Sequence, residues 1–284
     1  EICEDAWAAD RPGRHLAMHG ADLICNPSAS HFAFGKAEVR KRFVLDGSRA
    51  FGVGYVYANL LGNEAGRAIY DGGALIAEAG ELKAQGPRFG FKECVVTTAQ
   101  LDLDRIRMKR AVRATSDVAT GDEERRTIDV VAIALQRSFA PESPRSIADT
   151  PVPHSDAKEE EFLRAECLGL FDHLRKSRSR GFVVSLSGGA DSGAVSCLCA
   201  LMVRLARGEL GDDELKRRLG HIAALQHSTD TNAMVGAILT CVYQATRHSS
   251  QTTQTAATQL AQAIGATFIF LDVDNLVQDY VHKI

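Results

Sequence analysis

A loop rich in glycine and hydroxyl side chains, Ser-Gly-Gly-Ala-Asp-Ser at 187–192, is the clearest candidate phosphate-binding site in this chain of 284 residues. Apolar residues at 182–186 predict a buried strand before it, and the pattern of 190–207 predicts a helix after it. Such a helix start presents unpaired N–H groups to an anion, and glycine lets the backbone approach closely. The candidate contacts are Leu186, Ser187, Gly188, Gly189, Ala190, Asp191 and Ser192.

The side chains of this loop also suit a metal ion held beside phosphates. Asp191 is a hard carboxylate and a candidate Mg²⁺ ligand, while Ser187 and Ser192 add hydroxyl donors. The loop lacks the Gly-Lys-Ser/Thr ending of a P-loop, and Ser185 stands where a nucleophile elbow needs glycine. An ordinary glycine-rich turn between a strand and a helix is the alternative interpretation.

Ser-Gly-Gly-x-Asp-Ser resembles the pyrophosphate loop of the ATP pyrophosphatase superfamily, whose members adenylylate a carboxylate or carbonyl oxygen. The resemblance implies that the loop binds ATP. A second stretch, 243–265, resembles the NAD synthetases within that superfamily through its paired serines, its Thr, its Leu-Ala and its Ile-Gly. Ser249 and Ser250 match the paired serines, which implies that they lie beside the ATP. Simple N-capping by Ser250 is the plainer alternative, and the two roles are compatible.

Cys3 is the second candidate centre. It lies in Glu-Ile-Cys-Glu-Asp-Ala-Trp at 1–7, which places a cysteine beside acidic residues. A lone cysteine is usually structural, but this context resembles the nucleophile turn of the nitrilase superfamily. That resemblance implies a thiolate that attacks an amide carbon, helped by a Glu base and a Lys that stabilises the oxyanion. In the family both helpers precede the cysteine, so we expect them outside this chain.

The segment 26–36 resembles the strand and loop that hold substrate glutamine in the same family. The resemblance implies that Glu4, Ser30 and Lys36 bind glutamine, with Ser30 and Lys36 suited to a carboxylate by their polar and cationic character. A solvated loop is the alternative. Three further short motifs look like the glutaminase domain of long NAD synthetases: Tyr57-Ala58-Asn59, Tyr70-Asp71-Gly72 and Ala84-Gln85-Gly86.

A nitrilase-like motif followed by an ATP pyrophosphatase motif is the arrangement of glutamine-dependent NAD synthetases. The resemblance implies a ligase that amidates deamido-NAD to NAD, using ATP, Mg²⁺ and ammonia from glutamine, and that forms homo-oligomers. Another glutamine-dependent amide ligase, or a catalytically inactive binding or scaffold module, are the alternatives. Because both ends look like cuts through folded domains, we expect a fragment that completes neither reaction alone.

The expected fold is α/β: a partial nitrilase-like αββα sandwich followed by a partial Rossmann-like parallel α/β synthetase domain. Four of the seven prolines lie between 141 and 153, which predicts an extended linker. The predicted division is 1–140 for the glutaminase part, 141–157 for the linker and 158–284 for the ATP-binding part.

Composition limits the possible partners. A net charge of −3 gives no electrostatic case for nucleic acid or an anionic membrane, and no apolar run reaches the roughly 18 residues of a membrane span. Arg40-Lys41-Arg42 is short and predicts a solvated face. Seven scattered cysteines, an odd number, argue against a disulfide framework and favour a cytoplasmic protein.

Hydrophobic patterns predict the elements that position these motifs. In the first part we expect strands at 22–25, 50–58, 94–99 and 128–133, a hairpin of 72–76 with 82–84, a helix at 103–114 and a loop at 115–124. In the second part we expect helices at 158–176, 190–207 and 250–264, strands at 181–186 and 267–273, a polar insertion at 209–218, and a strand or buried helix at 236–243.

Overall fold

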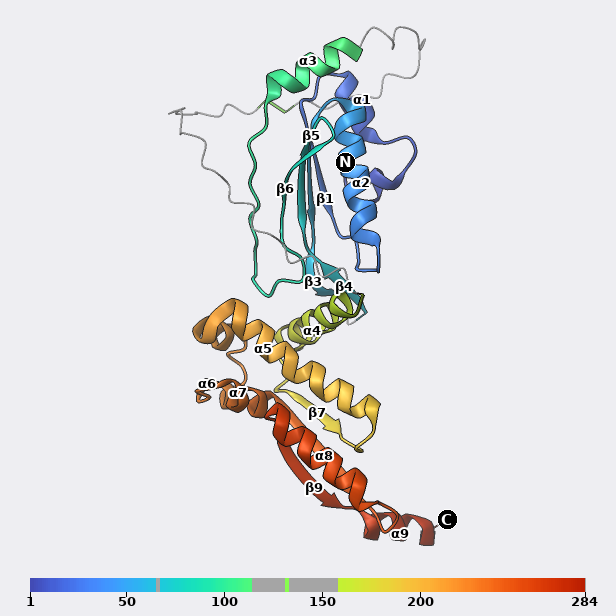
Figure 1. The fold of residues 1–284 in the computed structure, drawn as a ribbon, viewed down its shortest axis with the longest axis vertical. Coiled ribbons are helices and arrows are strands. Elements are labelled where there is room, and N and C mark those ends of the chain that lie inside the picture. The colour runs from blue at the N-terminus through green and yellow to red at the C-terminus, as the bar shows by residue number, and fades with distance from the viewer. Residues whose placement is uncertain (65–66, 114–130, 133–157, 284) are drawn as a thin grey trace. The chain divides into compact units, whose positions relative to one another are not determined.

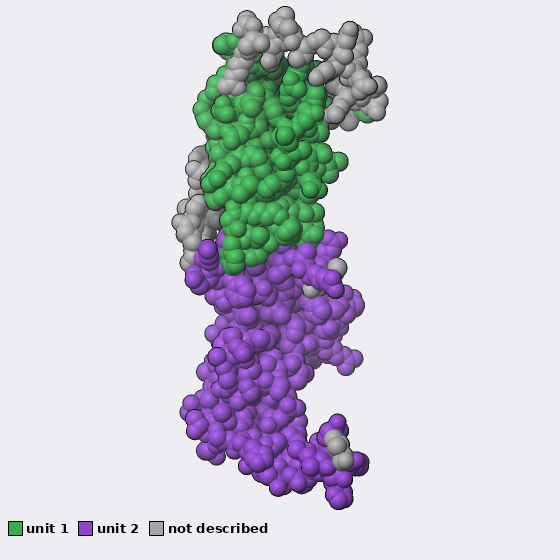
Figure 2. All heavy atoms as spheres, turned by 90° about the vertical axis from the view of Figure 1, so that its right-hand side faces the viewer, with its two compact units in different colours: residues 1–61, 70–88, 94–154 green, residues 62–69, 89–93, 155–284 purple. Residues whose placement is uncertain are grey.

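A computed structural model describes residues 1–64, 67–113, 131–132 and 158–283 (Figure 1). The predicted linker and loop, and all but two residues of the predicted strand at 128–133, lie outside these ranges. The chain divides into two compact units (Figure 2). The first unit contains Glu1–Leu61, Tyr70–Arg88 and Cys94–His154, and the second contains Gly62–Ile69, Phe89–Glu93 and Ser155–Ile284.

The first unit is built on a mixed four-stranded sheet in the order β1-β2-β5-β6. β1 and β2 are parallel, with Leu23 opposite Gly54, and β5 and β6 continue the sheet as the predicted antiparallel hairpin. The bounds are η1 Cys3–Trp7, α1 Pro12–Met18, β1 Leu23–Ser28, α2 Lys36–Phe51, β2 Gly54–Asn59, β5 Ala74–Glu78, β6 Glu81–Gln85 and α3 Leu103–Arg113. A separate two-stranded sheet pairs β3 Leu61–Glu64 with β4 Ala68–Asp71.

Helix α2 packs against β2 and β5 on one face of this sheet (Figure 1). In β1, Ile24 is buried while its neighbour Cys25 is exposed. The core of the unit comprises Ala17, Ile24, Val44, Val53, Tyr55, Tyr57, Leu75 and Ala77. This core fixes α2, and with it the side chains that α2 directs toward the ends of β1 and β2.

Two predictions for the first unit were wrong. The strand predicted from residue 50 begins at Gly54, because α2 runs to Phe51 and ends at Gly52, whose φ of 64° suits glycine. The strand predicted at 94–99 is absent from these described residues, which form no regular element. Val95 and Val96 are exposed there, so the apolar residues that predicted this strand do not belong to the core.

The second unit holds a three-stranded parallel sheet in the order β7-β8-β9, which confirms the predicted parallel α/β architecture. Its core includes Phe171, Leu186, Met202 and Tyr243. The bounds are α4 Lys158–Ser177, β7 Phe182–Ser185, α5 Ala190–Arg218, α6 Ala223–Gln226, α7 Thr231–Ile238, β8 Leu239–Ala245, α8 Gln251–Ile264, β9 Thr267–Asp272 and α9 Asp274–Lys283. No helix among the described residues is long and apolar enough to span a bilayer.

The structure corrects one boundary in this unit and resolves another. Residues 209–218, predicted as a polar insertion, are part of α5, which bends at Gly211, where φ is 75°. The apolar stretch at 236–243, predicted as a strand or a buried helix, contains the end of one and the start of the other: α7 ends at Ile238 and β8 begins at Leu239. Helix α8 has the predicted Ser N-cap and a terminal Gly265.

Candidate active sites

Cys3 begins a short 3-10 turn and adopts a φ of 46°, a left-handed conformation that L-residues rarely take. Two reciprocal hydrogen bonds hold this turn: the backbone N–H of Ile2 donates to Asp5 Oδ2 at 2.8 Å, and the N–H of Asp5 donates to the Ile2 carbonyl at 3.1 Å. The thiol is partly exposed, as is needed for attack on a substrate, and Glu4 beside it is exposed. Such local strain is typical of a functional position.

The segment before Cys3 is anchored by a buried carboxylate. The side chain of Glu1 is fully buried and accepts hydrogen bonds from Arg11 Nη2 at 2.9 Å, the Gly13 N–H at 2.9 Å and the Tyr55 hydroxyl. Burial opposes ionisation of Glu1, but its hydrogen bonds to Arg11 and Tyr55 outweigh burial and lower its pKa. A charged, fully bonded Glu1 therefore fixes the backbone two residues before the candidate nucleophile.

Lys36, at the start of α2, lies in the same neighbourhood. Its ammonium group is 5.7 Å from the centroid of the Trp7 ring and 3.4 Å from the ring nitrogens of His31. Burial and the nearby Arg40 lower the pKa of Lys36, whereas the charge of a Cys3 thiolate raises it. The structure thus brings Cys3 and Lys36 within electrostatic reach of each other.

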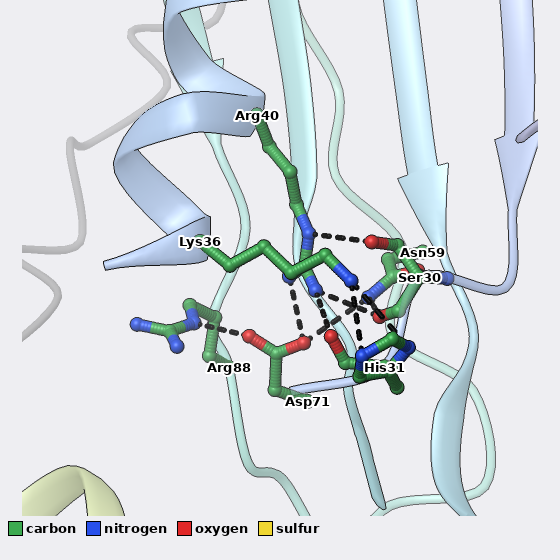
Figure 3. A network of polar contacts seen from close by, with 7 residues as sticks. All are labelled: Ser30, His31, Lys36, Arg40, Asn59, Asp71 and Arg88. Carbon is green, nitrogen blue, oxygen red and sulfur yellow. Dashed lines mark hydrogen bonds and ion pairs between the residues drawn. The ribbon is translucent and has the colours of Figure 1, made fainter. Parts of the chain in front are cut away.

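A buried ion pair lies behind Lys36 (Figure 3). Arg40 and Asp71 are 3% and 0% exposed, and Arg40 Nη1 lies 2.7 Å from Asp71 Oδ1. Oδ1 also accepts a hydrogen bond from Asn59 Nδ2 at 3.1 Å, and the other carboxylate oxygen, Oδ2, accepts from Arg88 Nε at 2.7 Å. A buried ion pair is tolerated when further hydrogen bonds replace the lost water, as they do here.

This network holds Ser30 in place. The Ser30 N–H donates to Asn59 Oδ1 at 2.8 Å, and its carbonyl accepts from Arg40 Nη2 at 2.7 Å and Asn59 Nδ2 at 3.0 Å. Its hydroxyl oxygen accepts from Arg40 Nε at 3.1 Å, which leaves the hydroxyl proton available to donate. Ser30 is 5% exposed, so only a closely fitted ligand group could reach it.

The prediction of a solvated face at 40–42 was wrong for Arg40, although Arg42 is exposed. The positioning residues Arg40, Asn59 and Asp71 were missed as site residues. A signal did exist, because Tyr57-Ala58-Asn59 and Tyr70-Asp71-Gly72 are two of the short motifs that resemble the glutaminase domain. Ser30, Lys36 and Glu4 remain predicted ligands of glutamine.

The candidate phosphate loop lies between β7 and α5. Leu186 is fully buried, and its N–H donates to the Val242 carbonyl of β8 at 2.8 Å, which fixes the strand end. Beyond it, the Ser187 N–H donates to Ser192 Oγ at 3.2 Å and the Gly189 N–H donates to Ser187 Oγ at 3.3 Å. The serine hydroxyls occupy positions that phosphate oxygens could take, since both accept hydrogen bonds from the loop backbone.

At Gly188 this loop packs closely against the start of α8, next to the turn that carries the paired serines. Its φ is 81°, and a Cβ atom there would lie 2.3 Å from the Thr253 carbonyl oxygen in the first turn of α8. Ser250 Oγ caps α8 by accepting from the Thr253 N–H at 3.2 Å, and Ser249 Oγ accepts from the Thr246 N–H at 3.0 Å. The two helix N-termini therefore meet at one edge of the parallel sheet, as expected for a ligand site in an open α/β fold.

Asp191 lies in the first turn of α5, where it is exposed and forms no ion pair with other described residues. The hydroxyl of Ser192 in that turn lies 3.1 Å from the hydroxyl of Ser187 in the preceding loop. These are oxygen donors, which fit the preference of Mg²⁺. The described residues contain no group of three or more His, Cys, Asp or Glu able to hold a metal by themselves. A Mg²⁺ ion here would take its remaining ligands from phosphate and water.

Comparisons with known proteins agree with both motifs. Residues 162–284 match the family model described as NAD synthase. The chain is 33% identical over 287 residues to the glutamine-dependent NAD(+) synthetase of Homo sapiens, which covers 98% of this chain and 40% of that protein. These findings confirm the resemblance to glutamine-dependent NAD synthetases. The chain spans about 40% of the length of the curated relatives it matches.

Two solved structures resemble the fold. A glutamine-dependent NAD(+) synthetase from Cytophaga hutchinsonii aligns with a TM-score of 0.70 and 37% identity, over 99% of this chain and 39% of that chain. A glutamine-dependent NAD+ synthetase from Acinetobacter baumannii, in complex with adenosine diphosphate, aligns with a TM-score of 0.57 and 18% identity, over 99% of this chain and 40% of that chain. The second similarity concerns the fold alone.

Proposed function

The chain is related to glutamine-dependent NAD(+) synthetases and carries an NAD synthase domain at residues 162–284, and from this premise we propose that it is part of an enzyme that amidates deamido-NAD to NAD. The enzyme hydrolyses glutamine with residues of the first unit and consumes ATP with residues of the second. The structural observation that supports the proposal is the meeting of two helix N-termini at Gly188 and Thr253, next to the paired serines.

In the first unit, the Cys3 thiolate attacks the side-chain amide carbon of glutamine. The C–N bond breaks, ammonia leaves, and a thioester forms that water then hydrolyses to glutamate and free Cys3. Lys36 and the Ser30 hydroxyl suit the α-carboxylate of glutamine, and the exposed carboxylate of Glu4 suits its α-ammonium group. The general base and the oxyanion-stabilising lysine are assigned to no residue of this chain.

In the second unit, the loop Leu186–Ser192 binds the ATP phosphates, and the turn at Ser249 and Ser250 lies beside the nucleotide. A carboxylate oxygen of deamido-NAD attacks the α-phosphorus and displaces pyrophosphate. Ammonia then attacks the acyl carbon and displaces AMP, giving NAD. Mg²⁺ bound by Asp191 and phosphate oxygens would neutralise the phosphate charge. The ADP complex of the Acinetobacter baumannii relative supports a nucleotide in this fold.

Coupling the two reactions follows from their chemistry. A carboxylate resists amidation because an oxide anion is a poor leaving group, and adenylylation replaces it with AMP. Ammonia is mostly protonated at neutral pH, so its local release from glutamine supplies the reactive free amine. We assign glutamine hydrolysis to 1–140, a linker to 141–157 and ATP binding to 158–284, and we propose a homo-oligomer in the cytoplasm.

A cysteine substitution in the full-length enzyme tests this proposal. Cys3→Ala should lower NAD synthesis from glutamine by about a thousandfold or more, because the nucleophile is lost. Synthesis from added ammonium chloride should keep its rate, because ammonia bypasses the first site. Cys94→Ala removes another exposed cysteine of the same unit and should change neither rate. Equal loss of both activities in Cys3→Ala would contradict the two-site assignment.

A further inference from the structure

A cavity in the second unit is strongly basic. It measures about 340 Å³ and lies where the end of α4, the residues after it and the end of α5 come together. Its lining consists of Glu93, Arg175, Arg178, Arg217, Arg218, Gly220 and His221. The segment from Arg178 leads into the start of β7, whereas the loop at Ser187 follows the end of β7. The cavity and the nucleotide loop are therefore different sites.

Two of the four arginines are neutralised by carboxylates on their own helices. Arg175 Nη2 lies 2.5 Å from Asp172 Oδ1, and Arg217 Nη2 lies 2.6 Å from Glu214 Oε1. The carboxylate of Glu93 is the one acidic group in the lining. The remaining guanidinium groups are therefore in excess of the negative charge around them.

Arg178 and Arg218 supply that excess. Neither forms an ion pair with another described residue, and the charge of Glu93, which attracts Arg218, offsets only part of this excess. Arg218 is half-buried, donates a hydrogen bond to the Phe91 carbonyl and has its guanidinium carbon 5.6 Å from the centroid of the Phe171 ring. Burial and the nearby Arg175 lower the pKa of Arg218. Crowding of like charges with partial desolvation costs free energy, which a bound anion would offset.

We propose that this cavity binds a small anion carrying at least two phosphate groups, of which inorganic pyrophosphate is the simplest form. Guanidinium groups bind phosphate oxygens in pairs through parallel N–H donors, and two unpaired arginines match two phosphate groups. The volume lies within the range of small-molecule pockets, so the whole anion fits inside. The chemistry of the cavity does not depend on the reaction proposed above.

Residue-resolved arginine modification tests the site in the full-length protein. Phenylglyoxal labelling, read by mass spectrometry with increasing pyrophosphate and no Mg²⁺, should show protection of Arg178 and Arg218. Arg180, two residues along, is exposed and does not line the cavity, so its labelling should not change. Pyrophosphate bound at the Ser187 loop alone would protect none of the three and would overturn the proposal. Arg178 and Arg218 that resist labelling before pyrophosphate is added would also overturn it, because the cavity would then be covered.

Matched variants separate a specific site from general attraction. Arg178→Gln should raise the pyrophosphate concentration that half-protects Arg218 by about tenfold to a hundredfold, the effect of losing one charge-assisted contact. Arg180→Gln changes the net charge equally and should leave that concentration unchanged. An equal increase in both variants would show non-specific electrostatics and would contradict the site. Inorganic phosphate should protect Arg218 only at higher concentration than pyrophosphate, and equal potency would contradict the requirement for two phosphate groups.

Discussion

The candidate glutamine site of the first unit is supported by charged side chains that are buried and paired with one another, whereas the candidate nucleotide loop of the second unit is mostly exposed and has one charged residue. Arg40 and Asp71 are almost completely buried, and their hydrogen bonds end on Ser30, Asn59 and Arg88. In the loop, Ser187 and Gly189 are exposed, and their contacts are hydroxyl and backbone groups of the loop itself.

This difference shows two ways to hold a charged ligand. Glutamine is a small zwitterion, and a rigid buried network can hold one hydroxyl and one ammonium group in position for it. A triphosphate carries several negative charges, and helix N-termini with glycine let many backbone donors approach it without fixed cations. Loss of a buried charge should therefore damage the fold around the first site, while loss of a glycine should damage ligand binding at the second.

The largest effect is expected from Arg40→Met. It removes one of the two arginines that pair with the buried carboxylate of Asp71, and breaking a buried ion pair typically costs about 3–5 kcal/mol. It also removes the hydrogen bonds that Arg40 donates to the hydroxyl and carbonyl oxygens of Ser30. Hydrogen exchange in the full-length protein should therefore rise sharply in peptides that cover Ser30 and β1. Arg42→Met removes an exposed arginine of the same helix as a control. Similar exchange in the two variants would show that the ion pair of Arg40 and Asp71 does not stabilise Ser30 and β1.

In the first site, residues that belong to short sequence motifs were predictable, whereas a contact between residues far apart in the sequence was not. Cys3, Ser30 and Lys36 occur in short motifs, so their roles were predictable as hypotheses. Arg40 was not, because a cluster of three basic residues is normally solvated. Its carboxylate partner, Asp71, is 31 residues away in the sequence, and only the tertiary fold brings the two side chains together. A buried ion pair between distant residues leaves no local pattern, so its existence requires the tertiary structure.

The next largest effect is expected from Gly188→Ala in the nucleotide loop. An alanine Cβ would lie 2.3 Å from the Thr253 carbonyl oxygen, and the left-handed φ alone costs about 1–2 kcal/mol. Since the loop must shift to relieve this clash, kcat/KM for ATP with ammonia as nitrogen donor should fall about a hundredfold. In Gly208→Ala, a Cβ in α5 meets no atom within 4 Å and should leave ATP use unchanged. A normal kcat/KM for Gly188→Ala would show that the two turns need not meet.

A smaller effect is expected from Asp191→Asn, which keeps the size of the side chain and removes its charge. Loss of one charge-assisted contact, about 1.5–3 kcal/mol, corresponds to a decrease of about tenfold to a hundredfold in kcat/KM for ATP. The decrease should occur with glutamine and with ammonia, and excess Mg²⁺ should partly restore the rate. Asp213→Asn changes an exposed aspartate of the same helix and is the control. Unchanged dependence on Mg²⁺ would remove Asp191 as a metal ligand.

The second site was more predictable than the first because its determinants are local. Strand, loop and helix follow one another at 182–207, and the Ser250 cap and Gly265 stop are read directly from residue type. The contact between Gly188 and Thr253 could not be read this way, since it requires β8 to lie beside β7. The continuation of α5 through Gly211 was also missed, because Leu215 and Leu219 supply apolar contacts on the far side of the bend. The division into domains remains a prediction, since its boundary falls on residues outside the described ranges.

The smallest effect concerns pH and would separate the two sites in one experiment. Burial and Arg40 lower the pKa of Lys36 below its ordinary value of 10.5. The ammonium form exists below that lowered pKa, so attraction for the glutamine carboxylate is present there and is lost as pH rises through it. KM for glutamine should increase by about tenfold on this alkaline limb, the effect of one charge-assisted hydrogen bond. Lys36→Arg keeps its charge at these pH values and should move the limb to higher pH, while ammonia-dependent synthesis should show no limb at this position in either protein. If glutamine-dependent and ammonia-dependent synthesis both weakened at the same alkaline pH, the titrating group would not be Lys36. Lys36 would then be a structural residue at the start of α2.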